Sequence, residues 1–414
     1  MHSIRRSCQS VLRNSGSAVA YANGSRRAFS RSVARSKGGL PVFLEPSSTE
    51  LSSALAKINS KVLLPEHLTR EQQKLVYKEK GRAKLETEPV EVTVGEVTLP
   101  LEHIDRNVRP GRWESLQEVV NQSETAADWE NVVRVLEGFH SAGIEVKPRW
   151  QELVVRKLNE NGHHSIVLKA LQRVKATGLR LSNYPVAFRV LKGAHERAAD
   201  SDWDGDETVK ALRYARQVVE LMEEEEHYAV SSLKGAKQGP TDWRSAPYVI
   251  AVPTELAAVV AQKHEGDIEL VKNLANRLVN ALKQDNTAAP IKPQRKTIQE
   301  TSSVQAQDSI DRVAALAKRT EADFRGRAAQ TDGLNQYCQG LFETTVVWNA
   351  LKTSKAVLGA DMPLAAEAAE YESRAKQVLD DSVQALLKLQ TRAGEEIKSQ
   401  YPAYVQEQMK KCQA

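Results

Sequence analysis

The chain has 414 residues, of which 41% are hydrophobic, 5% aromatic and 27% charged, and its formal net charge is +5. This length allows one large or two medium domains. The low aromatic content is typical of helix-rich proteins whose cores are built from Ala, Leu and Val. No run of 18 apolar residues occurs, so the sequence predicts no membrane span.

Residues 1–44 contain eight Lys or Arg, nine Ser and no Asp or Glu. An Arg- and Ser-rich segment without acids is typical of a mitochondrial targeting peptide, so we expect a basic leader and a mature protein in the mitochondrial matrix. The run Arg27-Ala28-Phe29-Ser30 resembles the pattern that matrix processing peptidases cut, which predicts cleavage between Phe29 and Ser30. The alternative is a disordered basic arm that binds nucleic acid.

Cleavage at that position would change the charge of the chain. Five arginines would be removed: Arg5, Arg6, Arg13, Arg26 and Arg27. Taking five positive charges from +5 leaves a mature chain near zero. Proteins threaded deep into RNA usually keep a strong basic excess, so a neutral chain is expected to contact protein or only the edge of an RNA surface.

Residues 45–110 are predicted to be a linker with a short helix and one β-hairpin. Pro and Ser occur within 41–53, and Glu, Gln and Lys favour a short helix over 69–80. Between residues 90 and 99, apolar and polar residues alternate about a central Gly-Glu pair, which predicts the hairpin.

Residues 111–227 have the apolar spacing of amphipathic helices. Gly143, Gly162 and Gly178 follow predicted helix ends, where left-handed caps are common. Similar segments precede two helix pairs, and their glycines, Gly143 and Gly178, are 35 residues apart. A period in the mid-thirties with two helices per unit is typical of a helical-hairpin repeat solenoid.

The units over 129–198 resemble degenerate pentatricopeptide repeats: a helix, a short turn, a second helix and a Gly-aliphatic link. In that family, stacked helical hairpins form a groove that reads single-stranded RNA one base per repeat. The resemblance places Glu152 and Ala187 at base-reading positions that normally hold Asn, Thr or Ser. Val146 and Leu181 replace the usual Pro, so the resemblance implies a kept scaffold without the RNA code.

Residues 228–253 contain closely spaced Gly and Pro and are predicted to be a loop. Residues 254–414 are predicted to be a C-terminal helical region, with a polar linker at 286–300 and helices over 254–263, 267–284, 304–325, 335–355, 364–394 and 401–414. The expected fold class is all-α, a helical-hairpin repeat solenoid followed by a C-terminal helical region, with one small β-hairpin near the N-terminus.

No Gly-rich phosphate loop, His-Glu-x-x-His helix or nucleophile elbow occurs in the sequence. We therefore expect no catalytic residue, cofactor, metal site or small-molecule substrate. Once Cys8 leaves with the leader, Cys338 and Cys412 remain, and two distant thiols do not by themselves form a zinc site or suggest a disulfide.

Two clusters of cations are candidates for contact with RNA or a partner protein. Their members are Arg173, Lys175 and Arg180 in the repeats, and Lys292, Arg295 and Lys296 in the polar linker. The alternative for each cluster is ordinary surface Lys and Arg. Four successive glutamates at 223–226 could contact a basic partner or a divalent ion, or form a solvated helix end.

The expected function is a structural, non-catalytic component of the mitochondrial ribosome. Mitochondrial ribosomes are rich in added helical proteins, so the resemblance implies ribosomal proteins as partners and leaves direct contact with rRNA or mRNA open. The alternatives are a pentatricopeptide-type RNA-binding factor in mitochondrial mRNA processing or translation, and a matrix assembly adaptor.

Overall fold

The helices before the repeats are packed elements, in contrast to the predicted linker. The computed structural model describes residues 38–105, 107–227, 243–285, 308–319, 326–392 and 395–413. Helix α1 (Thr49–Lys57) continues into the π-helix η1 (Ile58–Leu63) and α2 (Leu64–His67). Leu51, Ile58 and Leu63 are fully buried, so the prediction of a linker was wrong here. Pro46 and Ser47 precede the cap residue Ser48, whose Oγ accepts a hydrogen bond from Leu51 N at 3.2 Å.

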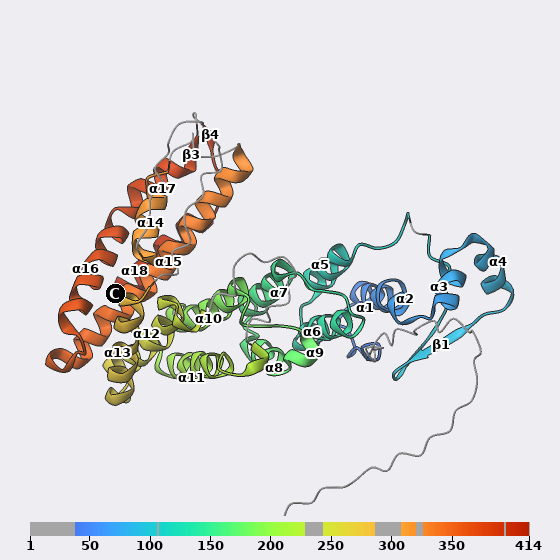
Figure 1. Ribbon diagram of the computed structural model, residues 1–414, viewed down its shortest axis with the longest axis horizontal. Coiled ribbons are helices and arrows are strands. Elements are labelled where there is room, and N and C mark those ends of the chain that lie inside the picture. Colours follow the sequence, from blue (N-terminus) through green and yellow to red (C-terminus); the bar gives the residue numbers. More distant parts are fainter. Residues whose placement is uncertain are drawn as a thin grey trace, which may run out of the picture. The chain divides into compact units, whose positions relative to one another are not determined.

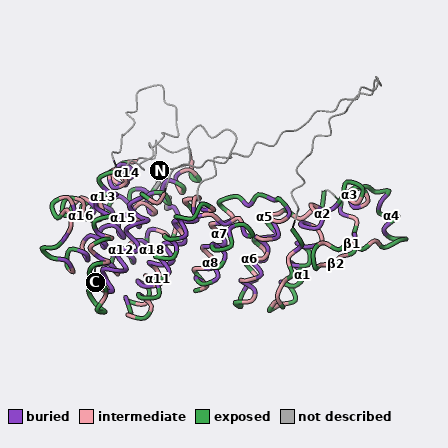
Figure 2. The backbone as a smooth tube through the Cα atoms, turned by 60° about the horizontal axis from the view of Figure 1, so that its bottom comes forward, coloured by how far each residue is buried: buried purple, intermediate pink, exposed green. Residues whose placement is uncertain are grey.

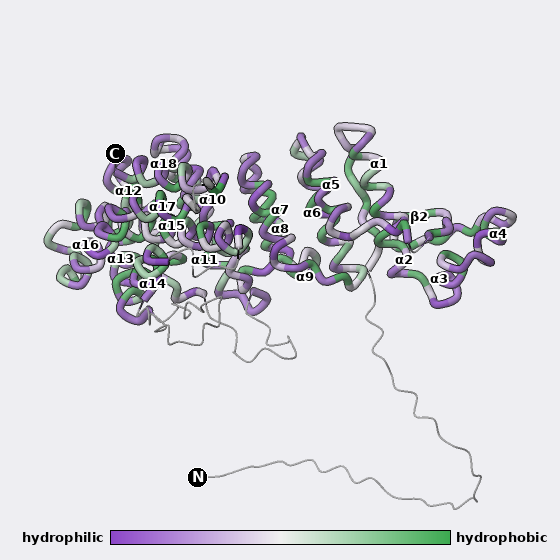
Figure 3. Tube along the Cα trace, turned by 90° about the horizontal axis from the view of Figure 1, so that it is seen from above, coloured by the Kyte–Doolittle hydropathy of each residue, from purple (hydrophilic) through white to green (hydrophobic). Residues whose placement is uncertain are grey.

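The helix predicted over 69–80 is divided at Lys78, which is extended, into α3 (Arg70–Tyr77) and α4 (Glu79–Thr87). Both helices are mainly hydrophilic (Figure 3). The predicted hairpin is confirmed, with β1 (Glu91–Val94) antiparallel to β2 (Val97–Pro100) and Val94 opposite Val97. Gly95 has a φ of 68°, a conformation that glycine adopts without steric cost.

The repeats form two layers of helices (Figure 1). One layer contains α5 (Arg112–Gln122), α7 (Pro148–Glu160) and α10 (Tyr184–Ala199), and the other contains α6 (Ala126–Ser141), α8 (His164–Gln172) and α11 (Gly205–Leu221). Within each layer successive helices contact one another, and α5–α6, α7–α8 and α10–α11 are the hairpins. A short helix, α9 (Val174–Thr177), follows α8. The left-handed caps are confirmed at Gly143, Gly162 and Gly178.

The next hairpin, α12 (Pro247–Lys263) and α13 (Ile268–Lys283), packs on α10 and α11. The loop predicted over 228–253 is therefore wrong from Pro247 onward. Pro247 lies in the first turn, where a missing N–H costs least, and Pro253 is tolerated inside a helix that is buried along most of its length (Figure 2). The short 3-10 turns η2 (Glu225–His227) and η3 (Trp243–Ser245) lie on either side of residues 228–242.

The C-terminal region is built around one long helix, α15 (Arg327–Leu358), which contacts α12, α13 and every later helix. The others are α14 (Ser309–Ala317), α16 (Ala365–Asp380), α17 (Ser382–Gln390) and α18 (Tyr401–Gln413), with the 3-10 turn η5 (Gly359–Asp361) after α15. The terminal helix is confirmed. A two-residue ladder of β3 (Thr391–Arg392) and β4 (Glu395–Glu396) replaces the end of the helix predicted over 364–394.

The all-α fold class is confirmed, and the buried apolar residues of the repeats and the C-terminal region belong to one continuous core. Among the described residues, every helix is too short or too polar to cross a bilayer. The predicted cleavage site at Phe29 and Ser30 and the linker cations Lys292, Arg295 and Lys296 lie outside the described residues.

Candidate functional site

The predicted cations of the repeats lie on the link between α8 and α10, and each contacts a group of this same chain. The Arg173 guanidinium forms an ion pair with Glu137 of α6. Lys175 forms an ion pair with the Glu226 carboxylate, and Arg180 Nη1 donates to the Glu226 backbone oxygen at 2.8 Å. The structure thus brings Lys175 and Arg180 together at Glu226, whereas Arg173 contacts a different helix.

The acidic run at 223–226 supplies partners for these cations. Besides Glu226, Glu223 forms an ion pair of 2.7 Å with Arg244. The adjacent His227 is buried, and its Nδ1 accepts a hydrogen bond from Leu181 N at 3.2 Å. Burial lowers the pKa of His227, which agrees with a neutral ring that accepts at Nδ1. At least two of the four glutamates are therefore paired within the chain, although 223–225 are exposed, as expected for a solvated end after α11.

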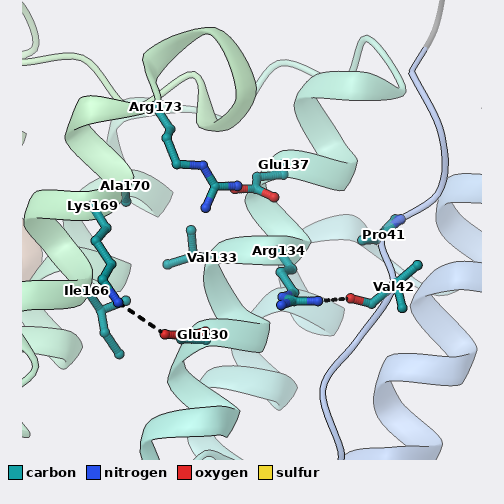
Figure 4. Close-up of a pocket in the computed structure, with 10 residues that line it drawn as sticks. All are labelled: Pro41, Val42, Glu130, Val133, Arg134, Glu137, Ile166, Lys169, Ala170 and Arg173. Carbon is teal, nitrogen blue, oxygen red and sulfur yellow. Dashed lines mark hydrogen bonds and ion pairs between the residues drawn. The ribbon is translucent and has the colours of Figure 1, made fainter.

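A groove lies between α6 and α8, and Arg173 is on its rim (Figure 4). Its floor is apolar and includes Val133, Ile166 and Ala170. The rim carries both signs of charge: Glu130, Arg134 and Glu137 on α6, and Lys169 and Arg173 at α8. Lys169 Nζ lies 3.6 Å from Glu130, and Arg173 pairs with Glu137. An apolar floor with alternating charges suits a protein surface of complementary charge better than a phosphate backbone.

One side of this groove is formed by an extended segment, residues 39–47, that lies along α6. Asn131 Oδ1 accepts from Leu44 N at 2.7 Å, and its Nδ2 donates to Leu44 O at 3.0 Å. Asp128 Oδ1 accepts from Ser47 N at 3.0 Å, and Arg134 donates to Val42 O (Figure 4). The α6 side chains thus hold an extended backbone independently of its side chains.

Sequence reasoning missed this contact, although a signal for it was present. Asp128 and Asn131 lie on the face of α6 that also carries Val132 and Leu136, and both polar side chains are completely buried. Polar groups are buried when they are hydrogen-bonded, so two of them beside an apolar stripe indicate a backbone partner. That partner is more than 80 residues away in the sequence.

At the two positions that the resemblance assigns to base reading, the side chains contact or are buried by other residues of this chain. Glu152 Oε1 accepts from Arg189 Nε at 2.6 Å and lies 3.5 Å from Arg156 Nε. Ala187 is fully buried. An RNA base would have to displace an ion pair at the first position and would find no exposed side chain at the second. The arrangement favours a scaffold that has lost the base-reading code.

Known proteins are similar to this chain over most of its length. Residues 27–411 match the family described as mitochondrial ribosomal protein mS27. The small ribosomal subunit protein mS27 of Neurospora crassa is 26% identical to this chain over 306 residues, which cover 72% of this chain and 76% of that protein. Since the family match extends over most of the sequence, this chain belongs to the mitochondrial ribosomal protein mS27 family.

Proposed function

We propose that this chain is a structural, non-catalytic component of the small subunit of the mitochondrial ribosome and that it acts in the mitochondrial matrix. The observation that carries the proposal is the family match over residues 27–411. The Neurospora crassa relative is named as a small ribosomal subunit protein, which supports the choice of subunit. The acid-free, Arg-rich leader supports the compartment.

The partners at the repeats are proposed to be ribosomal proteins, bound at the groove between α6 and α8. Its rim carries three cations and two anions over an apolar floor. Because Arg173 pairs with Glu137 and Lys169 with Glu130, a phosphate in the groove would have to compete with carboxylates that already hold these cations. A partner protein can match both signs of charge at once.

Contact with rRNA is proposed for the edge of the molecule and not for the base-reading positions. Lys175 is the most exposed of the three repeat cations, with a side chain 84% exposed. The linker residues Lys292, Arg295 and Lys296 add a second basic cluster of the kind that meets phosphates. These six cations remain proposed contacts with RNA or a partner protein.

The test is affinity purification of the tagged full-length chain from mitochondria, with quantitative mass spectrometry and rRNA measurement across a series of salt concentrations. The proposal expects the small-subunit proteins in near-equal amounts, together with small-subunit rRNA, and little change up to moderate salt. Binding through phosphate contacts alone would instead fall steeply with salt. Recovery of mRNA without ribosomal proteins would contradict the proposal.

A further inference from the structure

Three side chains with metal-binding chemistry meet in the interior where α10, α12 and α18 pack together. His195 Nδ1 lies 2.7 Å from Glu255 Oε2, and Cys412 Sγ lies 3.8 Å from Glu255 Oε1. One ligand atom from each residue lies within 4.8 Å of the others. His195 and Glu255 are fully buried, and Cys412 is 3% exposed. The three residues are far apart in the sequence, so only the fold brings them together.

The surroundings hold these groups in place. Asn349 of α15 donates from Nδ2 to Glu255 Oε1 at 2.6 Å, which orients the carboxylate. The rings of Trp203 and Phe342 lie nearly perpendicular to the His195 ring, with centroids 5.7 and 5.2 Å away. Hydrogen bonds and packing around the ligands of a metal are what fix their orientation and shield the site from water.

We infer that His195, Glu255 and Cys412 bind a structural zinc ion. Magnesium and calcium prefer all-oxygen sites, whereas zinc accepts thiolate, imidazole and carboxylate ligands. Ligand atoms around one tetrahedral zinc lie about 3 to 4 Å apart, since the bonds are about 2.0–2.3 Å long. The separations here include 2.7 Å from His195 Nδ1 to Glu255 Oε2 and 3.8 Å from Cys412 Sγ to Glu255 Oε1, all within 4.8 Å, so small side-chain shifts would seat the ion.

Charge balance permits a divalent ion at this position. Zn²⁺ with one thiolate, one carboxylate and one neutral imidazole has a net charge of zero, which lowers the cost of burying each charged group. The metal replaces the proton shared by His195 Nδ1 and Glu255, and the Cys412 thiol loses its proton. Binding therefore releases protons to the solvent.

The zinc ion would join the last helix to the repeats. Helix α18 already contacts α10, where Tyr404 Oη donates to Glu196 at 2.8 Å, and Trp203 Nε1 donates to the Lys411 backbone oxygen at 3.2 Å. A bond from Cys412 to a metal held by α10 and α12 would fix this end of the helix. The three side chains supply three of the four ligands of a tetrahedral zinc, and their burial keeps a substrate from the fourth position.

The test is the metal content of the purified full-length chain, followed by replacement of zinc with cobalt. The inference expects one zinc per chain and a sulfur-to-cobalt charge-transfer band in the near-ultraviolet. Cys412→Ser should lose the band, and both Cys412→Ser and His195→Gln should bind zinc at least about tenfold more weakly. The matched control, Cys8→Ser with Cys338→Ser, leaves Cys412 as the single thiol. It should keep both the charge-transfer band and the zinc affinity.

The X-ray absorption spectrum of the zinc-loaded control variant keeps the inference testable even where Cys412→Ser fails to fold. One sulfur neighbour with nitrogen and oxygen neighbours would support the site. A folded wild-type chain without stoichiometric zinc, a Cys412→Ser chain that keeps the charge-transfer band, or a spectrum without sulfur would overturn it.

Discussion

Asp128 shows how one side chain ties two parts of the chain together. Its Oδ2 accepts from the backbone N and the Oγ1 of Thr125, both at 2.8 Å, and its Oδ1 accepts from Ser47 N. Burial by itself would raise the pKa of Asp128, but the hydrogen bonds from Ser47 and Thr125 outweigh it and hold the pKa well below its ordinary value. The ionised form is therefore stabilised by folding.

We expect Asp128→Asn to lower the free energy of unfolding by about 1–3 kcal/mol at pH 7, because one donor at the start of α6 or on the extended segment loses its acceptor. The wild-type advantage should be complete above the unfolded pKa of about 3.9. It should diminish as the pH falls below that value toward the lower folded pKa. Urea unfolding of both chains at several pH values measures this difference. A difference that is independent of pH would contradict the account.

A second residue-scale prediction separates the internal role of Arg173 from its proposed contact with a partner. Arg173→Glu replaces the ion pair between Arg173 and Glu137 with two carboxylates that repel each other. The double variant Arg173→Glu with Glu137→Arg restores an ion pair, with the two charges exchanged between the positions. We expect both variants to reduce association with the small subunit, since both reverse the charge that the partner meets. Because exposed pairs contribute about 0–1 kcal/mol, stability should change little. Full rescue of association by the double variant would show that the groove does not bind through this charge.

At the scale of elements, the left-handed glycines after the helices differ in what surrounds them. Gly178 has a φ of 68° and Gly143 a φ of 73°, so a side chain strains the backbone at either position. A Cβ atom added at Gly178 would also lie 2.8 Å from His140 Cδ2, whereas at Gly143 it would meet nothing within 4 Å.

We therefore expect Gly143→Ala to destabilise the fold by about 1–2 kcal/mol through backbone strain alone. Gly178→Ala should cost more, because the His140 ring must also move. Thermal unfolding of the two variants under identical conditions measures the difference. Equal effects would mean that contact with His140 adds nothing.

Local signals predicted many of the elements. The glycine caps, Pro148 at the start of α7 and the alternation around Gly95 each depend on neighbours within a few residues. The N-terminal helices and the start of α12 were missed because Pro and Ser were interpreted as loop signals. In the structure, Ser48 is a helix cap, and the packing of α12 against α15 offsets the cost of Pro253.

The candidate sites could not be predicted in full from the sequence, because their residues are brought together from distant parts of the chain. Arg173, Lys175 and Arg180 could be identified from the sequence, but their partners could not, since Glu137 is 36 residues from Arg173. His195 and Cys412 each lie far in sequence from Glu255, 60 and 157 residues away. Without the packing of α10, α12 and α18, nothing relates these three residues.

At the scale of the whole molecule, the repeats and the C-terminal helices share one core. Helix α12 belongs to both, because it packs on α10 and α11 on one side and on α15 elsewhere (Figure 1). The groove on the repeats is therefore held by a large folded support and does not depend on a single hairpin. A folded support of this kind suits a protein whose role is to hold neighbouring proteins in position.

The measurement that tests the central claim most directly is sedimentation of a gentle mitochondrial lysate through a sucrose gradient, followed by detection of this chain. A structural component of the ribosome should migrate with the small subunit and should remain there at moderate salt. Migration near the top of the gradient, or with RNA–protein particles that ribonuclease dissolves, would contradict the account.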